Sequence, residues 1–202
     1  MKSPSIRTTG LMLAVVLSAA AGCARQTACP PAASAPLPKV APAAAKGALD
    51  DYVELPYRAS FEAYQAVERD LWARSLPRFF KGYQRRHFYD GPLVSQVASG
   101  FTFPPGAVLE RAVTGERLMW SRRPHDGNSM VALLLSPSDE LLSVALVGGD
   151  CALGGKDCPD GIGLVIYTPK GKASPDRIDP LRAWAKANGA YSQRPERVVQ
   201  LP

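Results

Sequence analysis

The sequence is poor in the residues that most enzymes use for catalysis. It contains two histidines, His87 and His125, in 202 residues. It has no Gly-x-Ser-x-Gly, no His-Glu-x-x-His and no glycine-rich phosphate loop before a helix. A hydrolytic metal site usually takes three protein ligands around an open position, which two separated histidines do not supply. We therefore expect no enzyme, no metal and no cofactor, since a hydrolase would need a carboxylate or hydroxyl cluster that the sequence does not reveal.

Long blocks of like charge are also missing. The basic residues are scattered apart from the pairs Arg85-Arg86 and Arg122-Arg123. After residue 22 the chain holds 22 Lys and Arg against 18 Asp and Glu, a formal charge of +4. No predicted strand alternates aromatic and basic residues. This mild positive charge argues against a nucleic-acid partner.

No hydrophobic run is long enough to cross a bilayer. The run over residues 11–22 has 12 residues, whereas a spanning helix needs about 20. Lys2 and Arg7 precede it without an acid, which is the order of an export signal rather than of a short transmembrane helix. Small residues close the run before Cys23, as in a bacterial lipoprotein signal.

This resemblance implies removal of residues 1–22 and attachment of acyl chains to Cys23, which would anchor the chain in a membrane. Ala24, in place of an aspartate, favours the outer membrane. The expected location is therefore the cell envelope, with the protein facing the periplasm.

Two zones follow the signal. Residues 23–49 are rich in proline and alanine, with no periodic apolar face. Proline lacks an amide donor and favours extended backbone, so this zone predicts a semi-stiff tether. Residues 50–202 are long enough to bury a core and predict a single globular domain.

Cysteine use agrees with export. Cys151 and Cys158 flank a short loop that contains two glycines. In an oxidising compartment this spacing predicts a disulfide, which would contribute roughly 2–3 kcal/mol. A metal site is the alternative, but no histidine lies near. Cys29 has no evident partner.

Helical patterns lie at both ends of the domain. Ser60 is a candidate cap for a helix over residues 60–75, which Pro77 breaks or restarts. A second short helix is expected over residues 79–88, where aromatic and basic residues alternate. It is either a core stripe or a surface for an anionic glycan or lipid headgroup. Asp179 and Pro180 predict the start of a last helix, and Asn188-Gly189 its end.

Between them, short apolar runs alternate with turn residues from Gly91 onward. The expected strands cover residues 108–113, 117–121, 130–135, 141–147 and 162–167. Tight connections join them, as in an antiparallel meander. The predicted fold class is α+β, an antiparallel β-sheet meander with flanking helices.

One turn between two predicted strands carries candidate chemistry. Residues 121–129 include Arg123, Pro124, His125 and Asp126 and form a turn by composition. Such a turn presents an imidazole and a carboxylate to a partner from a rigid sheet. The alternative is a polar turn without a function.

The segment around this turn resembles the inhibitor of vertebrate lysozyme family, called Ivy. That family has Cys-Lys-Pro-His-Asp-Cys on a turn between antiparallel strands, and residues 122–127 here read Arg-Arg-Pro-His-Asp-Gly. The flanks are also similar, from the Gly-Phe-Thr-Phe-Pro of residues 100–104 to the Ser-Pro-Ser-Asp turn of residues 136–139. The resemblance covers residues 91–147. Arg122 and Gly127 stand in place of the two loop cysteines.

The resemblance implies a function for the loop. Members of the family inhibit c-type lysozymes by placing the loop histidine against the catalytic carboxylates. His125 would be the inserted group, Asp126 its support and Pro124 a stiffener, with Arg123 in place of the family's lysine. The expected target is a c-type lysozyme or a lytic transglycosylase. The alternative is an envelope structural, interaction or toxin-immunity lipoprotein that does not inhibit lysozyme and binds its partner through residues 79–88.

Overall fold

The computed structural model describes residues 47–101, 106–126, 128–151, 161–189 and 195–202. The elements are, in chain order, β1 Tyr52–Glu54, α1 Tyr57–Asp70, the π-helix Leu71–Ser75, α2 Leu76–Phe80, α3 Leu93–Gly100, β2 Ala107–Arg111, β3 Arg117–Arg122, β4 Met130–Leu135, β5 Leu141–Gly148, β6 Gly163–Pro169, α4 Pro175–Ala187 and β7 Arg197–Leu201.

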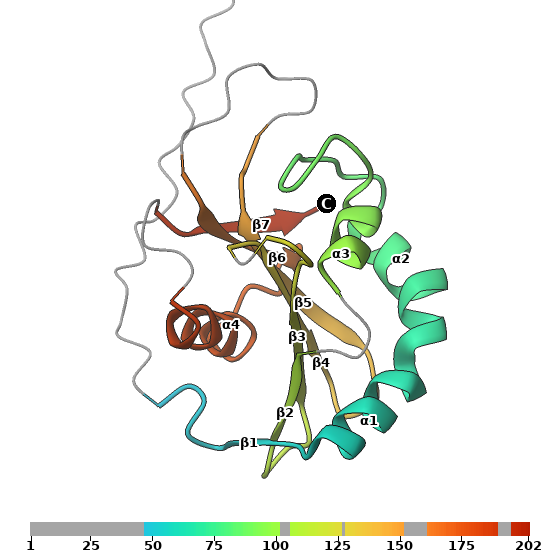
Figure 1. Ribbon diagram of the computed structural model, residues 1–202, viewed down its shortest axis with the longest axis vertical. Coiled ribbons are helices and arrows are strands. Elements are labelled where there is room, and N and C mark those ends of the chain that lie inside the picture. The colour runs from blue at the N-terminus through green and yellow to red at the C-terminus, as the bar shows by residue number, and fades with distance from the viewer. Residues whose placement is uncertain (1–46, 102–105, 127, 152–160, 190–194) are drawn as a thin grey trace, which may run out of the picture. The chain divides into compact units, whose positions relative to one another are not determined.

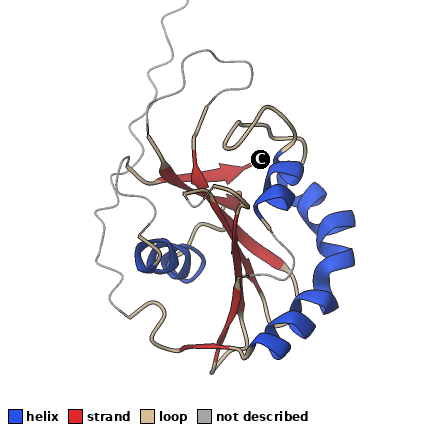
Figure 2. Cartoon of the chain, viewed as in Figure 1, coloured by secondary structure: helices blue, strands red, loops and turns tan. Residues whose placement is uncertain are grey.

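The strands form one seven-stranded sheet whose spatial order follows the chain from β1 to β7. Each neighbouring pair is antiparallel except β6 and β7, which are parallel because α4 connects them. Figures 1 and 2 show α1, α2 and α3 on one face of the sheet and α4 on the other. The fold is α+β, as the sequence predicts.

Two hydrophobic cores lie on the two faces of the sheet. In β4, Val131, Leu133 and Leu135 belong to the core under α1–α3, whereas Met130, Ala132 and Leu134 belong to the core under α4. Every residue of β4 and β5 is buried. A strand with both faces covered needs this continuous apolar pattern. Each buried aliphatic side chain contributes about 1.5–3 kcal/mol relative to exposure.

The central strands confirm the sequence prediction, and the two edge strands do not. The expected strands over 108–113, 117–121, 130–135, 141–147 and 162–167 correspond to β2 to β6 within a few residues. The edges β1 and β7 were not expected, and the last element is β7 rather than a helix. Both edge strands are short and only partly buried, so their apolar periodicity is weak.

The first helical region differs from its prediction at both ends. α1 begins at Tyr57 after Pro56, and Ser60 is buried inside the helix, where its hydroxyl donates to Leu55 O at 3.0 Å. The helix then widens into the π-turn and restarts as α2, with Pro77 in its first turn, where a missing amide donor costs little. The expected helix over residues 79–88 is wrong beyond Phe80, since Lys81 has φ +46° and ends α2.

α3 and the start of α4 also correct the prediction. Residues 93–100 form a helix after Pro92, where strands and turns were expected. α4 begins after Ser174, so Asp179 and Pro180 lie inside it rather than at its start. Its predicted end at Asn188-Gly189 is confirmed, and Gly189 has φ +67°.

The antiparallel strands give the sheet two ends, which we name by their connections. The loop end comprises residues 85–91, 120–126, 128–130, 147–151 and 195–197, around the β3–β4 loop. The turn end comprises residues 109–117, 135–141 and 169–172, around the β2–β3 and β4–β5 turns. The described chain enters at the turn end, where Ala112 N donates to Asp51 O at 2.9 Å.

Candidate functional site

The β3–β4 loop at the loop end is a closed hairpin connection. Arg123 N donates to Ser129 O at 2.9 Å directly after the last paired residues, Arg122 and Met130. Ser129 N donates to Asp126 O at 3.1 Å. These bonds lie at the base of the segment that the sequence singles out, so the structure places that segment at the tip of a hairpin. Residue 127 lies outside the described residues.

His125 is exposed on a tight turn. Asp126 N donates to Arg123 O at 3.3 Å, which makes Pro124 and His125 the two central residues of a four-residue turn. His125 has φ +60°, the left-handed conformation that glycine usually takes at this position after a proline. For a residue with a Cβ, that conformation costs roughly 1–2 kcal/mol. The loop holds this strain while it presents the imidazole to solvent.

The Asp126 carboxylate organises the loop from inside. It accepts from Ser129 Oγ at 2.6 Å and from Asn128 N at 3.3 Å, and it lies 3.8 Å from a guanidinium nitrogen of Arg123. Asp126 therefore supports the turn that displays His125. These hydrogen bonds close the loop.

Arg123 fastens the loop to the neighbouring 85–91 segment. Its guanidinium carbon lies 5.6 Å from the ring centroid of Phe88 and 5.8 Å from that of Tyr89. Phe88 fits because Gly148 at the end of β5 has no side chain, and a Cβ there would lie 2.8 Å from the ring. A cation–π contact of this kind contributes about 0.5–1 kcal/mol at an exposed site.

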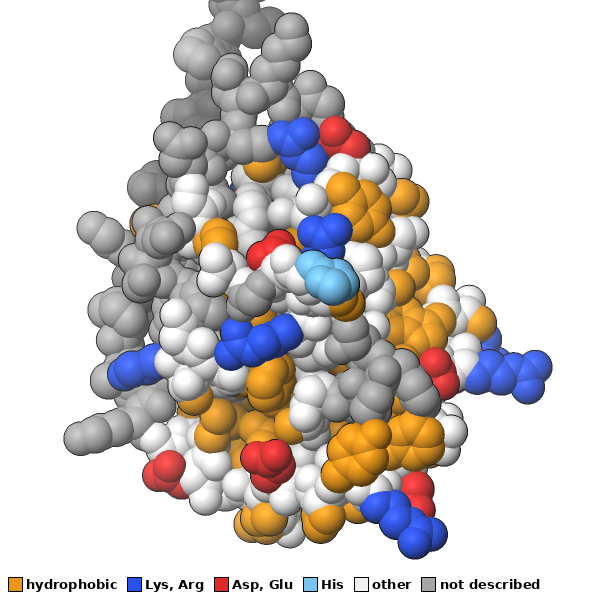
Figure 3. All heavy atoms as spheres, in the orientation of Figure 1, with side chains coloured by type: hydrophobic (Ala, Val, Ile, Leu, Met, Phe, Trp, Pro, Cys, Tyr) orange, Lys and Arg blue, Asp and Glu red, His pale blue; other side chains and the backbone are white. Residues whose placement is uncertain are grey.

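Arg122 lies on the other side of the loop. Its guanidinium carbon is 5.9 Å from the ring centroid of Trp120, and its terminal nitrogen donates to Asn188 Oδ1 at 3.3 Å. The ring centroid of Trp120 in turn lies 6.2 Å from that of Trp184 in α4. Figure 3 shows an exposed histidine on this face with basic and hydrophobic side chains near it.

Gln96 of α3 holds the 85–91 segment in place from below. Its side chain is fully buried and makes four hydrogen bonds. The amide oxygen accepts from His87 N at 2.8 Å and from Phe88 N at 3.1 Å, and the amide nitrogen donates to Arg85 O at 2.7 Å and Gly91 O at 2.8 Å. One side chain thus makes four hydrogen bonds to a segment that forms no helix and no named strand.

His87 is a buried structural residue. Its Nδ1 lies 2.5 Å from Gly149 O and its Nε2 lies 2.6 Å from the Tyr167 hydroxyl. Because a carbonyl oxygen can only accept, Nδ1 carries the proton and Nε2 accepts from Tyr167. Burial lowers the pKa of His87 to about 4, although the bond to Gly149 acts in the opposite direction. Burial also raises the pKa of Tyr167. His87 is therefore neutral at physiological pH.

Asp150 follows β5 and is held by two arginines. Arg85 Nε donates to Asp150 Oδ1 at 2.9 Å, and Arg197 of β7 pairs with the other carboxylate oxygen. The hydrogen bond to Asp150 raises the pKa of Arg85. This cluster connects the 85–91 segment with the end of β5 and the start of β7, which lie far apart in the sequence.

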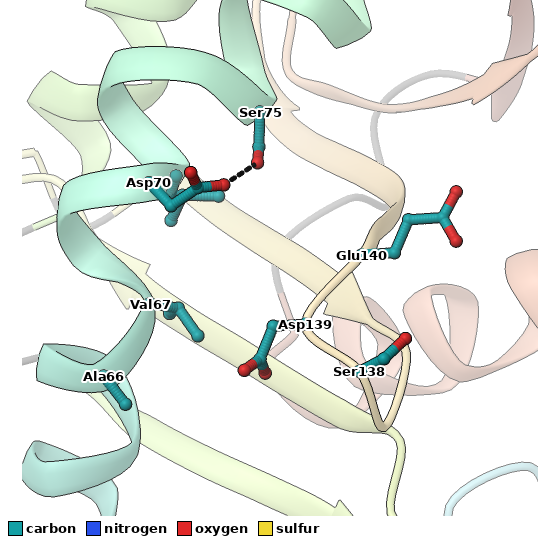
Figure 4. Close-up of a pocket in the computed structure, with 8 residues that line it drawn as sticks. Ala66, Val67, Asp70, Ser75, Ser138, Asp139 and Glu140 are labelled. Atoms are coloured by element: carbon teal, nitrogen blue, oxygen red, sulfur yellow. Dashed lines mark hydrogen bonds between the residues drawn. The ribbon is translucent and has the colours of Figure 1, made fainter.

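The turn end contains a pocket of about 370 Å³ between the π-helix and the β4–β5 turn. Figure 4 shows Asp70 and Ser75 on the helical side, and Asp139 and Glu140 on the turn. Asp70 accepts from Ser75 Oγ at 2.8 Å and pairs with Arg74, which lowers its pKa. Asp139 pairs with Arg117. The two aspartates are thus engaged in structural contacts.

The cysteine predictions fall mostly outside the described residues. Cys23, Cys29 and Cys158 lie there, so lipidation at Cys23 and the Cys151–Cys158 disulfide stay predictions. Cys151 is buried and bridges to Arg86, whose amide donates to Cys151 O at 3.0 Å. Among the described residues, no group of three or more His, Cys, Asp or Glu could hold a metal ion. No helix in the described ranges is long and apolar enough to span a membrane.

Several residues of the site were not found from the sequence. The expected aromatic–basic helix over residues 79–88 contains Phe80, which is core, and Phe88, which supports the loop. Phe80 and Tyr83 both contact the ring of Tyr167. Gln96 and Asp150 have no motif around them. Their roles depend on contacts between distant segments, which a local pattern does not contain.

The site thus joins an exposed, strained His125 to a hydrogen-bonded turn, an aromatic support and a cluster of arginines. No family model, no curated protein and no solved structure matches this chain.

Proposed function

We propose that this protein is a lipid-anchored envelope protein that inhibits or regulates a lysozyme-like, peptidoglycan-cleaving enzyme by inserting its β3–β4 loop into the active-site cleft. The observation that supports this most directly is the exposed imidazole of His125 on a closed, hydrogen-bonded turn at the tip of a hairpin. The resemblance of residues 91–147 to the Ivy family supports the choice of target.

The chemistry of the insertion follows from the groups involved. Glycan-cleaving enzymes of this type hold two carboxylates beside the scissile bond. An imidazole placed between them would hydrogen-bond to one carboxylate, and the field of both would favour its protonated form. The histidine would also occupy the space of a sugar ring. The protein therefore acts as a binding protein rather than as an enzyme.

The rigidity of the loop supports inhibition. Ordering a floppy loop on binding costs about 1–2 kcal/mol per backbone residue. Here Asp126 and the backbone bonds of Arg123 and Ser129 hold the turn before a partner arrives. Pre-organisation of this kind lowers the cost of binding.

The proposed anchor fits the same arrangement. The described chain begins at Gly47 and enters the sheet at the turn end, next to the β2–β3 turn. The β3–β4 loop lies at the opposite end. A tether from Cys23 in the outer membrane would leave His125 accessible in the periplasm, where the cell wall is cut.

Inhibition assays test the proposal. The chain from residue 23 onward, with Cys23→Ser to prevent lipidation, is titrated into assays of a c-type lysozyme and of a lytic transglycosylase. We expect inhibition at micromolar concentration or below, and His125→Ala to weaken it at least about tenfold, as for loss of a central interface contact.

A control variant, Gln84→Ala, changes an exposed residue directly before the 85–91 segment and should inhibit normally. Binding without inhibition, or equal potency of His125→Ala, would contradict the insertion mechanism. Binding without inhibition would favour an interaction or toxin-immunity role instead.

A further inference from the structure

The phenyl ring of Phe88 fills a space between α3, the end of β5 and the β3–β4 loop. A Cβ at Gly148, the last residue of β5, would lie 2.8 Å from Phe88 Cε1, and a Cβ at Gly100, the last residue of α3, would lie 3.4 Å from Phe88 Cε2. The ring is partly buried and packs against the core under α1–α3. The guanidinium carbon of Arg123 lies 5.6 Å from the ring centroid. We call this space the Phe88 seat.

Elements outside the loop fix the backbone at the Phe88 seat. Phe88 N donates to the side-chain oxygen of Gln96 at 3.1 Å, and His87 N donates to the same oxygen at 2.8 Å. His87 O accepts from Gly149 N at 3.1 Å. The His87 ring also bonds to Gly149 O and to the Tyr167 hydroxyl. The position of the Phe88 ring is therefore determined by α3, β5 and β6.

The β3–β4 loop reaches this ring through one side chain. Among the described residues of the loop 123–129, the hydrogen bonds and the ion pair lie within the loop. The cation–π contacts of Arg123 with Phe88 and Tyr89 reach outside it. The left-handed backbone of His125 costs energy, and such a conformation persists only where its surroundings hold it. The contacts of Arg123 therefore give the strained turn an external support.

We propose that Phe88 is a positioning residue of the inhibitory loop: its ring holds Arg123, and Arg123 holds the turn that presents His125. This inference rests on the proposed function, because it assigns to the ring the presentation of the histidine that enters the cleft. A target enzyme then meets a turn that is already ordered, so the cost of ordering the turn does not reduce the affinity.

Two variants disturb the Phe88 seat in different ways, each made in the chain from residue 23 onward with Cys23→Ser. Phe88→Leu removes the ring and keeps an apolar side chain, whereas Gly148→Ala keeps the ring and places a methyl group against it. Amide hydrogen exchange in residues 123–129 of the free protein is measured, together with inhibition of the lysozyme and of the transglycosylase. We expect exchange to become about two- to fivefold faster and inhibition about two- to fivefold weaker, which corresponds to the loss of a cation–π contact.

Phe79→Leu is the matched control. Phe79 on α2 is also a partly buried phenylalanine that packs against the core under α1–α3. Thermal melts should show that both leucine variants fold, with reduced stability. Only Phe88→Leu should change the exchange of residues 123–129 and the inhibition. Equal effects of the two variants on the loop would mean that core stability, and not the ring, sets the order of the loop, and would overturn the inference.

A double-mutant cycle tests whether Phe88 acts through Arg123. Arg123→Gln removes the cation, so it should also speed exchange in residues 123–129. Once the cation is absent, Phe88→Leu should add little further, because the two residues share one contact. If the two effects multiply instead, the ring acts on the loop by another route and the inference fails.

The outcomes separate this inference from the proposed function. Faster exchange in Phe88→Leu, with a parent chain that inhibits neither enzyme, would support the positioning of the loop and overturn the inhibitory function. Weaker inhibition by Phe88→Leu with unchanged exchange in the free protein would mean that Phe88 contacts the enzyme itself, which overturns the positioning role and leaves inhibition standing. Unchanged exchange together with unchanged inhibition would overturn the inference as well.

Discussion

The two ends of the sheet hold their charges in opposite ways. At the turn end one arginine is shared by two acids, since Arg111 pairs with Asp51 and with Glu116. At the loop end one acid is shared by two arginines, since Asp150 pairs with Arg85 and Arg197. The same ionic chemistry therefore leaves carboxylates in excess in one cluster and guanidinium groups in excess in the other.

The β4–β5 turn and the β3–β4 loop, at the two ends, also differ in what their strained residue contacts. Both contain a residue with a Cβ in the left-handed conformation, Asp139 with φ +66° and His125 with φ +60°. Asp139 pairs with Arg117 on the adjacent strand, so its strain is offset by a structural contact. His125 is displayed to solvent from a turn that other residues hold. Strain at the loop end supports the presentation of a side chain, which is why we place the function there.

The largest expected effect comes from breaking the support of the loop end at Gln96. Gln96→Leu would leave two carbonyls and two amides without these partners, the His87 amide buried and the other three groups partly buried. Each such group costs about 1–3 kcal/mol, and partial relaxation should leave a total loss of about 3–4 kcal/mol. Urea denaturation measures it. Gln84→Leu, at an exposed site, should change stability by less than about 0.5 kcal/mol, and an equally small change at Gln96 would show that the segment is not held this way.

The second effect concerns pH and His87. Its pKa is lowered to about 4, so folding favours the neutral imidazole. The unfolded chain binds a proton near pH 6.5 and the folded chain does not. Stability from this residue is therefore complete above about pH 6.5 and falls as the pH drops towards 4, by about 3 kcal/mol in total.

Unfolding free energies measured between pH 7.5 and 4 test this difference. His87→Gln should flatten the decline between pH 6.5 and 4, whereas His125→Gln, at the exposed histidine, should leave it unchanged. A decline that persists in full in His87→Gln would assign the acid sensitivity to carboxylates instead.

The third effect compares the polar side chains that close the two connections. Asp126→Ala removes the bond to Ser129 Oγ at the loop end, and Ser136→Ala removes the bond from Glu140 N, 3.0 Å, at the turn end. Each should cost about 1 kcal/mol. Amide hydrogen exchange should increase in residues 123–129 only for the first variant and in residues 136–140 only for the second. Exchange that spreads to both ends would indicate that the ends are not independent.

The smallest effect separates the cost of a left-handed backbone, at His125 and Asp139, from the contribution of the ion pair between Asp139 and Arg117. His125→Gly removes the left-handed penalty but increases the entropy of the unfolded chain, so the two terms nearly cancel and stability should change by less than about 0.5 kcal/mol. Asp139→Gly also removes a left-handed penalty and raises the entropy of the unfolded chain, but it loses the ion pair with Arg117 as well. This variant should therefore be less stable than His125→Gly by up to about 1 kcal/mol. Thermal melts compare them. If His125→Gly is the less stable of the two, His125 has a structural role that its exposure does not suggest.

The central strands and the turn at His125 could be predicted from local pattern. β4 is an unbroken apolar run and β5 is one interrupted by Ser143, and turn residues bound both; Pro124 and Asp126 mark a turn by residue type. The helix boundaries were less predictable. Ser60 and Asp179 are good caps by residue type, but they lie inside α1 and α4, which begin at Tyr57 and Pro175, directly after Pro56 and Ser174.

The supporting layer of the site could not be predicted. His87 bonds to residues 62 and 80 positions away, and Arg85 pairs with an acid 65 positions away. Gln96 is a polar residue in a short helix that local pattern did not reveal. None of these residues has a signature in its own neighbourhood. His87 and Arg85 have partners in or next to distant strands, and Gln96 has partners in an irregular segment that folds back onto α3.

By itself, the sequence determined the buried strands, the exposed turn and the prediction of an anchored tether at Cys23, because each depends on residues adjacent in the chain. The tertiary structure alone decided that His87 is buried and neutral while His125 is displayed, and that arginines from three separate segments gather around the loop. The physical reason is that burial and charge clustering depend on which segments the sheet brings together, and antiparallel pairing from β1 to β6 brings distant residues to the same end.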